Sequence, residues 1–272
     1  MHLDDQIGYE FDALHALEPS GRTPKALFCD RRRGCLVMEW LPGRPLRYET
    51  DLETAAAILA DIHATPVPAD HHLLRPKAPL RAIYAECLDM VEHYFRWEQA
   101  DPEIVSLIRE MIDALGRMPM DSVSSAAPCM VNTELNSGNF LIDDHGRSHL
   151  IDWEKPLLSE PAQDLGHFLV PTTTFWKTDI ILTPEEIRRF MDAYVKAADG
   201  RFDTDEAARR LPLFFSMTCL RGITWCAMAL VEYSRPGRAI VNEDTLRKIK
   251  QYVSKDFIRN ILDRYIYQDF LR

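Results

Sequence analysis

The chain has 272 residues and a formal net charge of −10, with 46% hydrophobic and 27% charged residues. These proportions are typical of a soluble globular protein that is long enough for one large domain or two lobes. The acidic balance argues against nucleic-acid partners and against an anionic-membrane surface. No apolar run approaches the roughly 18 residues that cross a bilayer, and the N-terminus lacks the segments of a signal peptide. We therefore expect a cytoplasmic protein.

The first 45 residues predict a small α/β unit. Apolar residues at helical spacing predict a helix over Asp5–Leu17, which Pro19-Ser20-Gly21 ends. Two short apolar runs, Ala26–Cys29 and Cys35–Trp40, flank a basic turn and predict a pair of strands. The segment Leu41–Pro45 then breaks the second strand, as a linker between lobes does.

The rest of the chain is predicted to be mainly helical. Asp101 before Pro102, and Thr183 before Pro184, are typical helix starts with an N-cap and a proline in the first turn. Pro212 is expected to interrupt the longest apolar helical region. The expected helices cover Asp51–His63, Leu80–Trp97, Pro102–Leu115, Pro184–Ala198, Glu206–Tyr233 and parts of Asn242–Leu271.

One stretch inside this helical body has a different pattern. Glu134 and Asn139 lie in a polar loop, and Phe140–Ile142 follows as a short apolar run. After a polar turn, a second apolar run, Leu150-Ile151, leads directly into Asp152. We predict a β-hairpin with the two carboxylates and the amide gathered at one end. Any one of these residues alone is better explained as a solvated side chain, but the ordered set suits Mg²⁺ and a phosphate.

Three motifs in this stretch carry a family likeness. Asn132–Ile142 reads NTELNSGNFLI, Ile151–Glu154 reads IDWE, and Pro161–Leu165 reads PAQDL. In this order they resemble the catalytic loop (H-G-D-L-H-x-x-N and apolar residues), the I-D-W-E motif and the P-x-x-D-L segment of the aminoglycoside phosphotransferase and choline kinase family. Cys35–Leu46 resembles that family's hinge strand and its G-R-P-L exit, and Leu59–His63 resembles its L-x-x-x-H helix.

The resemblance implies an α+β, protein-kinase-like fold. Residues 1–41 would form the remnant of a small N-lobe, with a helix, two strands and the hinge. Residues 42–272 would form a large, mostly helical C-lobe with the embedded β-hairpin. The implied activity is the Mg²⁺-dependent transfer of the γ-phosphate of ATP to a hydroxyl of a small molecule.

The resemblance also implies roles for individual residues in the loop and hairpin. Asn139 and Asp152 would hold Mg²⁺ against the ATP phosphates. Glu134 would occupy the position of the aspartate that accepts the proton of the substrate hydroxyl. Asn132 stands where the family has histidine, and Asp164 would tie down the backbone of the catalytic loop.

Other roles lie outside the hairpin. Main-chain groups of Glu39 and Leu41, at the hinge, would meet adenine. Glu10 matches the helix glutamate that pairs with the ATP-binding lysine. The acceptor itself is not readable from the sequence. Candidate lining residues of its site, each better explained individually as packing or surface, are Trp176, Arg221, Trp225 and Glu232.

Two departures from the family pattern qualify this reading. The extra methylene of Glu134 displaces its carboxylate by roughly 1.5 Å, and an error of about 1 Å can cost on the order of 100-fold in rate. Only nine residues precede Glu10, and none is lysine, whereas the missing strands would need roughly 25 to 40 residues. A misassigned start, a truncation or a degenerate relative would each explain this, and we favour a missing N-terminal segment.

The leading hypothesis is therefore an ATP- and Mg²⁺-dependent small-molecule phosphotransferase. The main rival is a catalytically degenerate kinase-like binding or regulatory module, and a third reading is a metal-dependent hydrolase that uses Glu134 and Asp152. The uncovered edge of the two N-terminal strands leaves room for a homodimer.

Overall fold

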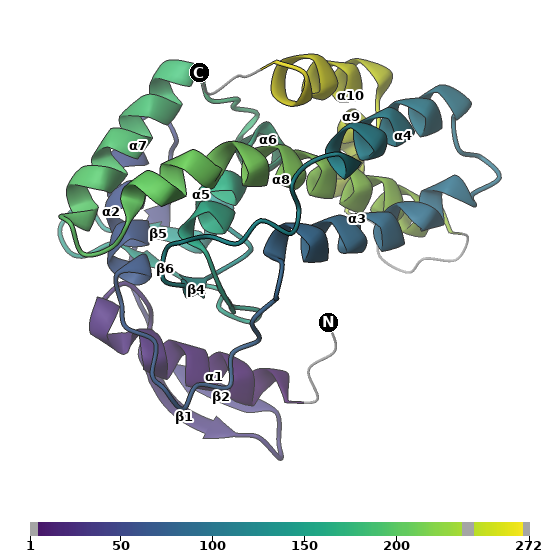
Figure 1. Ribbon diagram of the computed structural model, residues 1–272. Helices are drawn as coiled ribbons and strands as arrows, with labels where there is room; N and C mark the ends of the chain where they lie inside the picture. Colours follow the sequence, from purple (N-terminus) through teal and green to yellow (C-terminus); the bar gives the residue numbers. More distant parts are fainter. Residues whose placement is uncertain (1–4, 236–241, 269–272) are drawn as a thin grey trace.

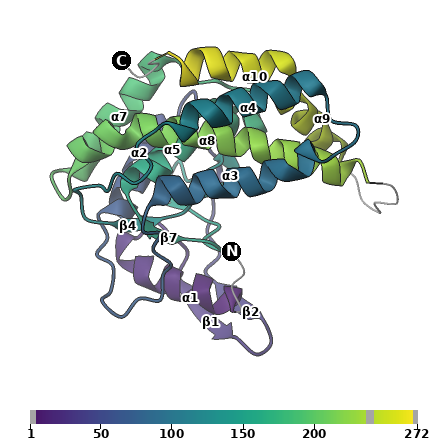
Figure 2. The ribbon, with the colours of Figure 1, turned by 45° about the vertical axis from the view of Figure 1, so that its right-hand side comes forward.

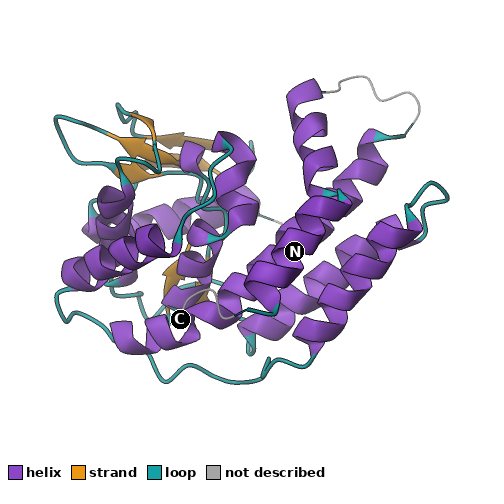
Figure 3. Ribbon diagram, turned by 90° about the horizontal axis from the view of Figure 1, so that it is seen from above, coloured by secondary structure: helices purple, strands orange, loops and turns teal. Residues whose placement is uncertain are grey.

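The structure is a computed structural model that describes residues 5–235 and 242–268. Helices make up most of the molecule, and the strands are few and short (Figure 3). The predicted α+β class, with a large helical part and an embedded hairpin, is confirmed. Residues 1–4 and the end of the predicted tail at Leu271 lie outside the described residues.

A small unit of one helix and two strands lies at the lower end of the molecule in Figure 1. Helix α1 (Gln6–Leu17) begins at Asp5, whose side chain caps it by accepting a hydrogen bond from the Gly8 N–H. A 3₁₀ turn follows it at once. Strands β1 (Ala26–Asp30) and β2 (Cys35–Met38) pair antiparallel, as predicted. Large apolar side chains of this hairpin, such as Leu27 and Phe28, are exposed at 62% and 56%.

Two small antiparallel sheets carry the chain through the stretch that contains the three motifs. Strand β5 (Phe140–Ile142) pairs with β6 (His149–Leu150), which confirms the predicted hairpin. Strand β3 (Arg44–Pro45) pairs with the other side of β5. Strand β4 (Cys129–Val131) pairs with β7 (Leu157–Ser159), so the chain enters and leaves the hairpin region side by side.

The helical part is built around α8 (Thr204–Tyr233), which packs against α3, α4, α5, α6 and α9 (Figures 1 and 2). Helices α2 and α7 pack on each other beside it. The remaining bounds are α2 Leu52–His63, α3 Pro79–Phe95, α4 Pro102–Gly116, α5 Pro161–Leu169, α6 Pro171–Thr178, α7 Pro184–Ala198, α9 Glu243–Tyr252 and α10 Lys255–Ile261.

Close packing of α5 on α8 positions the segment that supports the site. A Cβ added to Gly166 would lie 2.8 Å from the Cβ of Phe214 and 2.9 Å from its carbonyl carbon. Such distances leave no room for a side chain, so glycine sets the distance between the two helices. Asp164 and His167 lie on either side of Gly166 along α5, so the same close packing fixes their positions.

Two expectations about the α8 segment are wrong: that Pro212 interrupts the helix, and that no apolar run approaches the length that crosses a bilayer. The helix continues through Pro212, which was expected to interrupt it. Proline inside a helix costs about 3 kcal/mol, and burial of the neighbouring Leu211 and Phe214 offsets that cost. The helix also contains a window of mean hydropathy 1.5, long and apolar enough to cross a membrane. In this fold 61% of that window is buried, as in a core helix.

Candidate active site

The loop after β4 is anchored by a buried carboxylate. Asp164 has no exposed surface and accepts hydrogen bonds from the backbone N–H groups of Asn132, at 2.9 Å, and Thr133, at 3.1 Å. Its Oδ2 atom also lies 3.3 Å from Nε2 of His63, whose Nδ1 atom is 2.7 Å from the Tyr194 hydroxyl. The loop is thereby joined to α5, α2 and α7.

Thr133 has a strained backbone at the turn of this loop. Its φ is 73°, in the left-handed region that β-branched residues seldom adopt. The family pattern has glycine here, for which this conformation carries no steric cost. Two contacts hold it: the N–H bond to Asp164, and a hydrogen bond of 3.1 Å from the threonine hydroxyl to the Lys155 carbonyl. The strained turn sets the direction in which Glu134 leaves the loop.

Asn132 links the loop to the hairpin. Its Oδ1 atom accepts a hydrogen bond from the Glu134 N–H at 3.0 Å, and its Nδ2 group donates to the Asp152 carbonyl at 2.8 Å. The side chain is almost completely buried. An amide that both accepts and donates can bridge the two carboxylate-bearing residues in this way. This contact is a physical reason for asparagine at the position of the family's histidine.

Asn139 and Asp152 meet at the end of the hairpin beside Glu134. The Asn139 amide group donates to the Glu134 carbonyl at 2.7 Å and to Asp152 Oδ2 at 3.3 Å. Asp152 has a φ of 65°, a second left-handed residue without the freedom of glycine. The two side chains are thus in contact, and both carry oxygen atoms of the kind that Mg²⁺ takes as ligands.

The region between α1 and the hairpin holds an excess of negative charge. Burial first, and then the nearby Asp152 and Glu154, raise the pKa of Glu10. Burial, followed by Glu154, likewise raises the pKa of Asp152. Across the two described ranges, Glu10 forms no ion pair. Gln6 of α1 donates to Glu154 at 2.9 Å, so the helix is tied to the segment after Asp152.

Lys155 is a cation at this site that the sequence reasoning missed. Its ammonium group lies 2.7 Å from Glu154 Oε1 and 3.6 Å from Glu134 Oε1. The family motif I-D-W-E ends at Glu154, one residue before Lys155. The position of Lys155 directly after that motif was the available signal.

The hinge residues have free main-chain groups. The Glu39 N–H donates to the Lys25 carbonyl at 2.9 Å, which extends the pairing of β1 and β2. Within the described parts of the chain, the Glu39 carbonyl and the Leu41 N–H make no hydrogen bond. A ligand with a donor beside an acceptor, such as adenine, has matching partners there.

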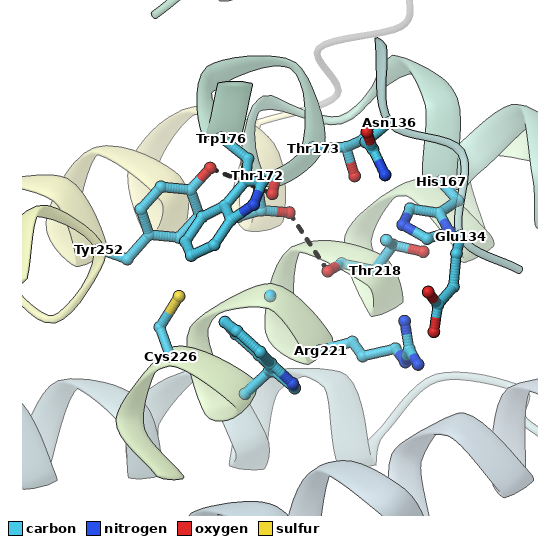
Figure 4. A pocket seen from close by; sticks show the side chains of 12 residues that line it. Glu134, Asn136, His167, Thr172, Thr173, Trp176, Thr218, Arg221, Cys226 and Tyr252 are labelled. Carbon is cyan, nitrogen blue, oxygen red and sulfur yellow. Dashed lines mark hydrogen bonds between the residues drawn. The ribbon is translucent and has the colours of Figure 1, made fainter. Parts of the chain in front are cut away.

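A cavity of about 220 Å³ opens beside Glu134 (Figure 4). The Glu134 carboxylate and the Arg221 guanidinium point toward each other at one end, next to His167. Arg221 is held from behind by Glu86 of α3, at 3.1 Å. Trp176 and Trp225 cross edge to face at the other end, with centroids 5.4 Å apart. The cavity thus joins a charged end to an aromatic end.

His167 lies between the catalytic loop and this cavity as a neutral group. Burial and the Arg221 charge lower the pKa of His167 to about 4. At neutral pH its imidazole therefore has one N–H donor and one acceptor nitrogen. Of the suggested acceptor-lining residues, Trp176, Arg221 and Trp225 line the cavity, and Glu232 does not.

Comparison with known proteins places the chain in a family. The family model described as "phosphotransferase enzyme family" matches residues 2–210. The chain belongs to this family. The match covers the catalytic loop, the hairpin, α5 and the first turns of α8, so the motif-based assignment is confirmed.

Solved structures of phosphotransferases share the fold at low identity. The choline kinase LicA from Streptococcus pneumoniae aligns with a TM-score of 0.59 and 16% identity, over 93% of this chain and 80% of that chain. A choline/ethanolamine kinase family protein from Mesorhizobium loti gives 0.58 and 17%, over 93% and 82%. The spectinomycin phosphotransferase APH(9)-Ia, solved with ADP and spectinomycin, gives 0.56 and 14%, over 93% and 81%. The protein-kinase-like fold is thereby confirmed.

Proposed function

We propose that this family member transfers the γ-phosphate of ATP to a hydroxyl of a small molecule, with Mg²⁺ as its metal ion. The observation that carries the proposal is the convergence of Asn139, Asp152 and Glu134, the last of which lines a cavity. Phosphoryl transfer needs positioning and charge neutralisation more than covalent chemistry by the protein. A rigid loop with hard oxygen ligands on one side and an acceptor cavity on the other meets both needs.

In this proposal Asn139 and Asp152 would hold the metal. When bound, Mg²⁺ neutralises the charge of the phosphates and orients them. The pKa values of Asp152 and Glu10 are raised first by burial and then by neighbouring carboxylates, and a cation bound here would relieve both effects. Asp164 and Asn132 hold the loop in its position beside the hairpin.

Glu134 receives the proton of the acceptor hydroxyl. Its backbone is fixed on both sides, by Asn132 through the N–H and by Asn139 through the carbonyl. Lys155 and Arg221 flank its carboxylate with positive charge. A carboxylate held in this way can act as a general base toward a hydroxyl in the cavity. The longer side chain of Glu134 thus has two cationic neighbours, Lys155 and Arg221.

Adenine is assigned to the hinge, against the free main-chain groups of Glu39 and Leu41. Val37 and Met38 of the preceding strand β2 are both exposed and add apolar surface near the hinge. We further propose a cytoplasmic location, in keeping with an α8 that is mostly buried in the core.

A catalytically degenerate binding module is the second candidate. It is favoured by Glu10, whose surroundings are acidic and which has no cationic partner within the described residues. The two candidates differ in turnover, while both allow nucleotide binding.

Mass spectrometry of phosphate transfer separates them. The protein is incubated with MgATP and pools of small alcohols, amino alcohols and sugars, and each pool is searched for a mass gain of one phosphoryl group. We expect a product that is lost in Asp152→Asn and in Glu134→Gln. If ATP binds and no pool yields a product, the binding module is the better description.

A further inference from the structure

A second cavity adjoins the first on the far side of His167, Thr218 and Arg221, which line both. It has a volume of about 460 Å³ and lies between α3, the loop before α3, and the segment that includes β7. Thr133 and Lys155 form its boundary with the catalytic loop. The second cavity therefore borders the loop that carries Glu134.

The lining of this second cavity is cationic, in a chain of net charge −10. Arg75, Lys155 and Arg221 contribute positive charge, and Glu86 is the one carboxylate among the lining residues. Glu86 is paired with Arg221, and Lys155 with Glu154. Arg75 makes no ion pair or hydrogen bond with any residue in 5–235 or 242–268. Its guanidinium is available to a ligand.

The side-chain amide of Gln163 also lines the cavity. Gln163 is 7% exposed, and its Oε1 atom accepts a hydrogen bond of 2.6 Å from the Ser159 hydroxyl. Its Nε2 group finds no acceptor in the described part of the chain. This N–H donor can therefore bind an oxygen atom of a ligand.

Apolar residues make up much of the rest of the lining: Leu74, Pro76, Pro79, Ala82, Ile83 and Leu157. A fitting ligand therefore has a short carbon skeleton and an anionic oxygen group, in the way small-molecule sites combine apolar walls with a few polar groups.

We propose that the second cavity binds the anionic group of the acceptor, so that the acceptor is a short-chain alcohol carrying a carboxylate or a phosphate. The inference rests on the proposed function, because it extends from the hydroxyl at Glu134. Arg75 and Gln163 hold the anionic group, and Arg221, which faces both cavities, lies along the path between it and Glu134. Arg75 and Gln163 are specificity-determining residues and take no part in the transfer itself.

Titration calorimetry with matched probes tests this assignment. The carboxylate arm compares hydroxy acids of three to six carbons with the corresponding diols, and the phosphate arm compares glycerol 3-phosphate with glycerol. We expect one arm to bind at least tenfold more tightly than its neutral partner. Arg75→Gln and Gln163→Leu should each lower the affinity for that anion about tenfold, which is the effect of losing one charge-assisted hydrogen bond. Both variants should bind the neutral probe as the wild type does.

Lys77→Gln is the matched control, since it removes a positive charge from an exposed side chain that does not line this cavity. It should leave the affinity for the anion unchanged. Equal affinity for charged and neutral probes, or equal loss in Lys77→Gln and Arg75→Gln, overturns the inference. MgATP titrated into the same samples keeps the two proposals apart. Anion binding without nucleotide binding contradicts the phosphotransferase, and phosphate transfer to neutral alcohols alone contradicts the anionic acceptor.

Discussion

At the scale of single residues, Glu134 is the departure from the family pattern that matters most. The neighbouring side chains are arranged for glutamate: Lys155 lies 3.6 Å from its carboxylate, and Arg221 points toward it (Figure 4). A shorter side chain in an otherwise unchanged loop would withdraw from both cations. The apparent defect is therefore part of a consistent local arrangement.

Shortening Glu134 to the aspartate of the family pattern should impair phosphate transfer and not improve it. In Glu134→Asp we expect phosphate transfer to fall about 100-fold, because the carboxylate retreats by about the length of one bond. MgATP affinity should be unchanged, since the nucleotide does not depend on this side chain. Initial rates and nucleotide titrations measure the two quantities separately. Faster transfer in Glu134→Asp would mean that the native glutamate is misplaced.

The raised pKa of Asp152 leads to a prediction of how stability depends on pH. The pKa of Asp152 is raised in the folded protein, so the folded state binds a proton more tightly than the unfolded state does. The stability that Asp152 contributes is therefore present below its unfolded pKa, near 4, and is lost as the pH rises through its folded pKa.

We therefore expect Asp152→Asn to raise the melting temperature of the ligand-free protein at pH 7, and to have a much smaller effect at pH 4. Mg²⁺ should stabilise the wild type at pH 7 and not this variant. Thermal melts at both pH values, with and without Mg²⁺, provide the check. A variant that is less stable than the wild type at pH 7 would contradict the assigned charge repulsion.

At the scale of elements, the close contact of α5 and α8 positions the catalytic loop. Asp164 holds the loop and lies two residues before Gly166, where the helices touch. Gly166→Ala should push the helices apart and cost roughly 1–3 kcal/mol of unfolding free energy, which urea denaturation measures. Transfer should fall as well, because Asp164 moves with α5. Gly34→Ala is a control, because an added Cβ meets nothing within 4 Å and its positive φ adds only local strain.

Whether the sequence predicts an element depends on how far apart its contacting residues lie along the chain. Helix starts such as Asp101 and Thr183, and the hairpin of β5 and β6, follow from residues close in sequence, and they were anticipated. The pairing of β3 with β5 joins residues almost one hundred positions apart, so no local pattern indicates it. Helix α8 passes Pro212 because its burial outweighs a local preference, which a reading of propensities underestimates.

For the site, the motifs and their order predict that Glu134, Asn139 and Asp152 lie together, and the loop and hairpin bring them into contact. The roles of Lys155, His167 and the second cavity do not follow from the sequence. Their significance arises from α3, α5 and α8 meeting around the loop, and each residue alone has an ordinary sequence context.

At the scale of the whole molecule, the small α/β unit is tied to the helical part through the site itself. Gln6 bonds to Glu154, and the Tyr9 hydroxyl donates to the Pro156 carbonyl at 2.6 Å. Glu10, between them, lies against the acidic cluster. A cation bound at Asp152 relieves repulsion on both sides of this junction. Metal and nucleotide binding are thus expected to tighten the contact between the two parts.

Magnesium-dependent nucleotide binding is the central claim, and calorimetric titration of ATP with and without Mg²⁺ tests it most directly. We predict saturable binding that needs Mg²⁺ and is weakened at least tenfold in Asp152→Ala, with Asp144→Ala, in the exposed hairpin turn, as the control. Binding of equal strength without Mg²⁺, or in Asp152→Ala, would contradict the account.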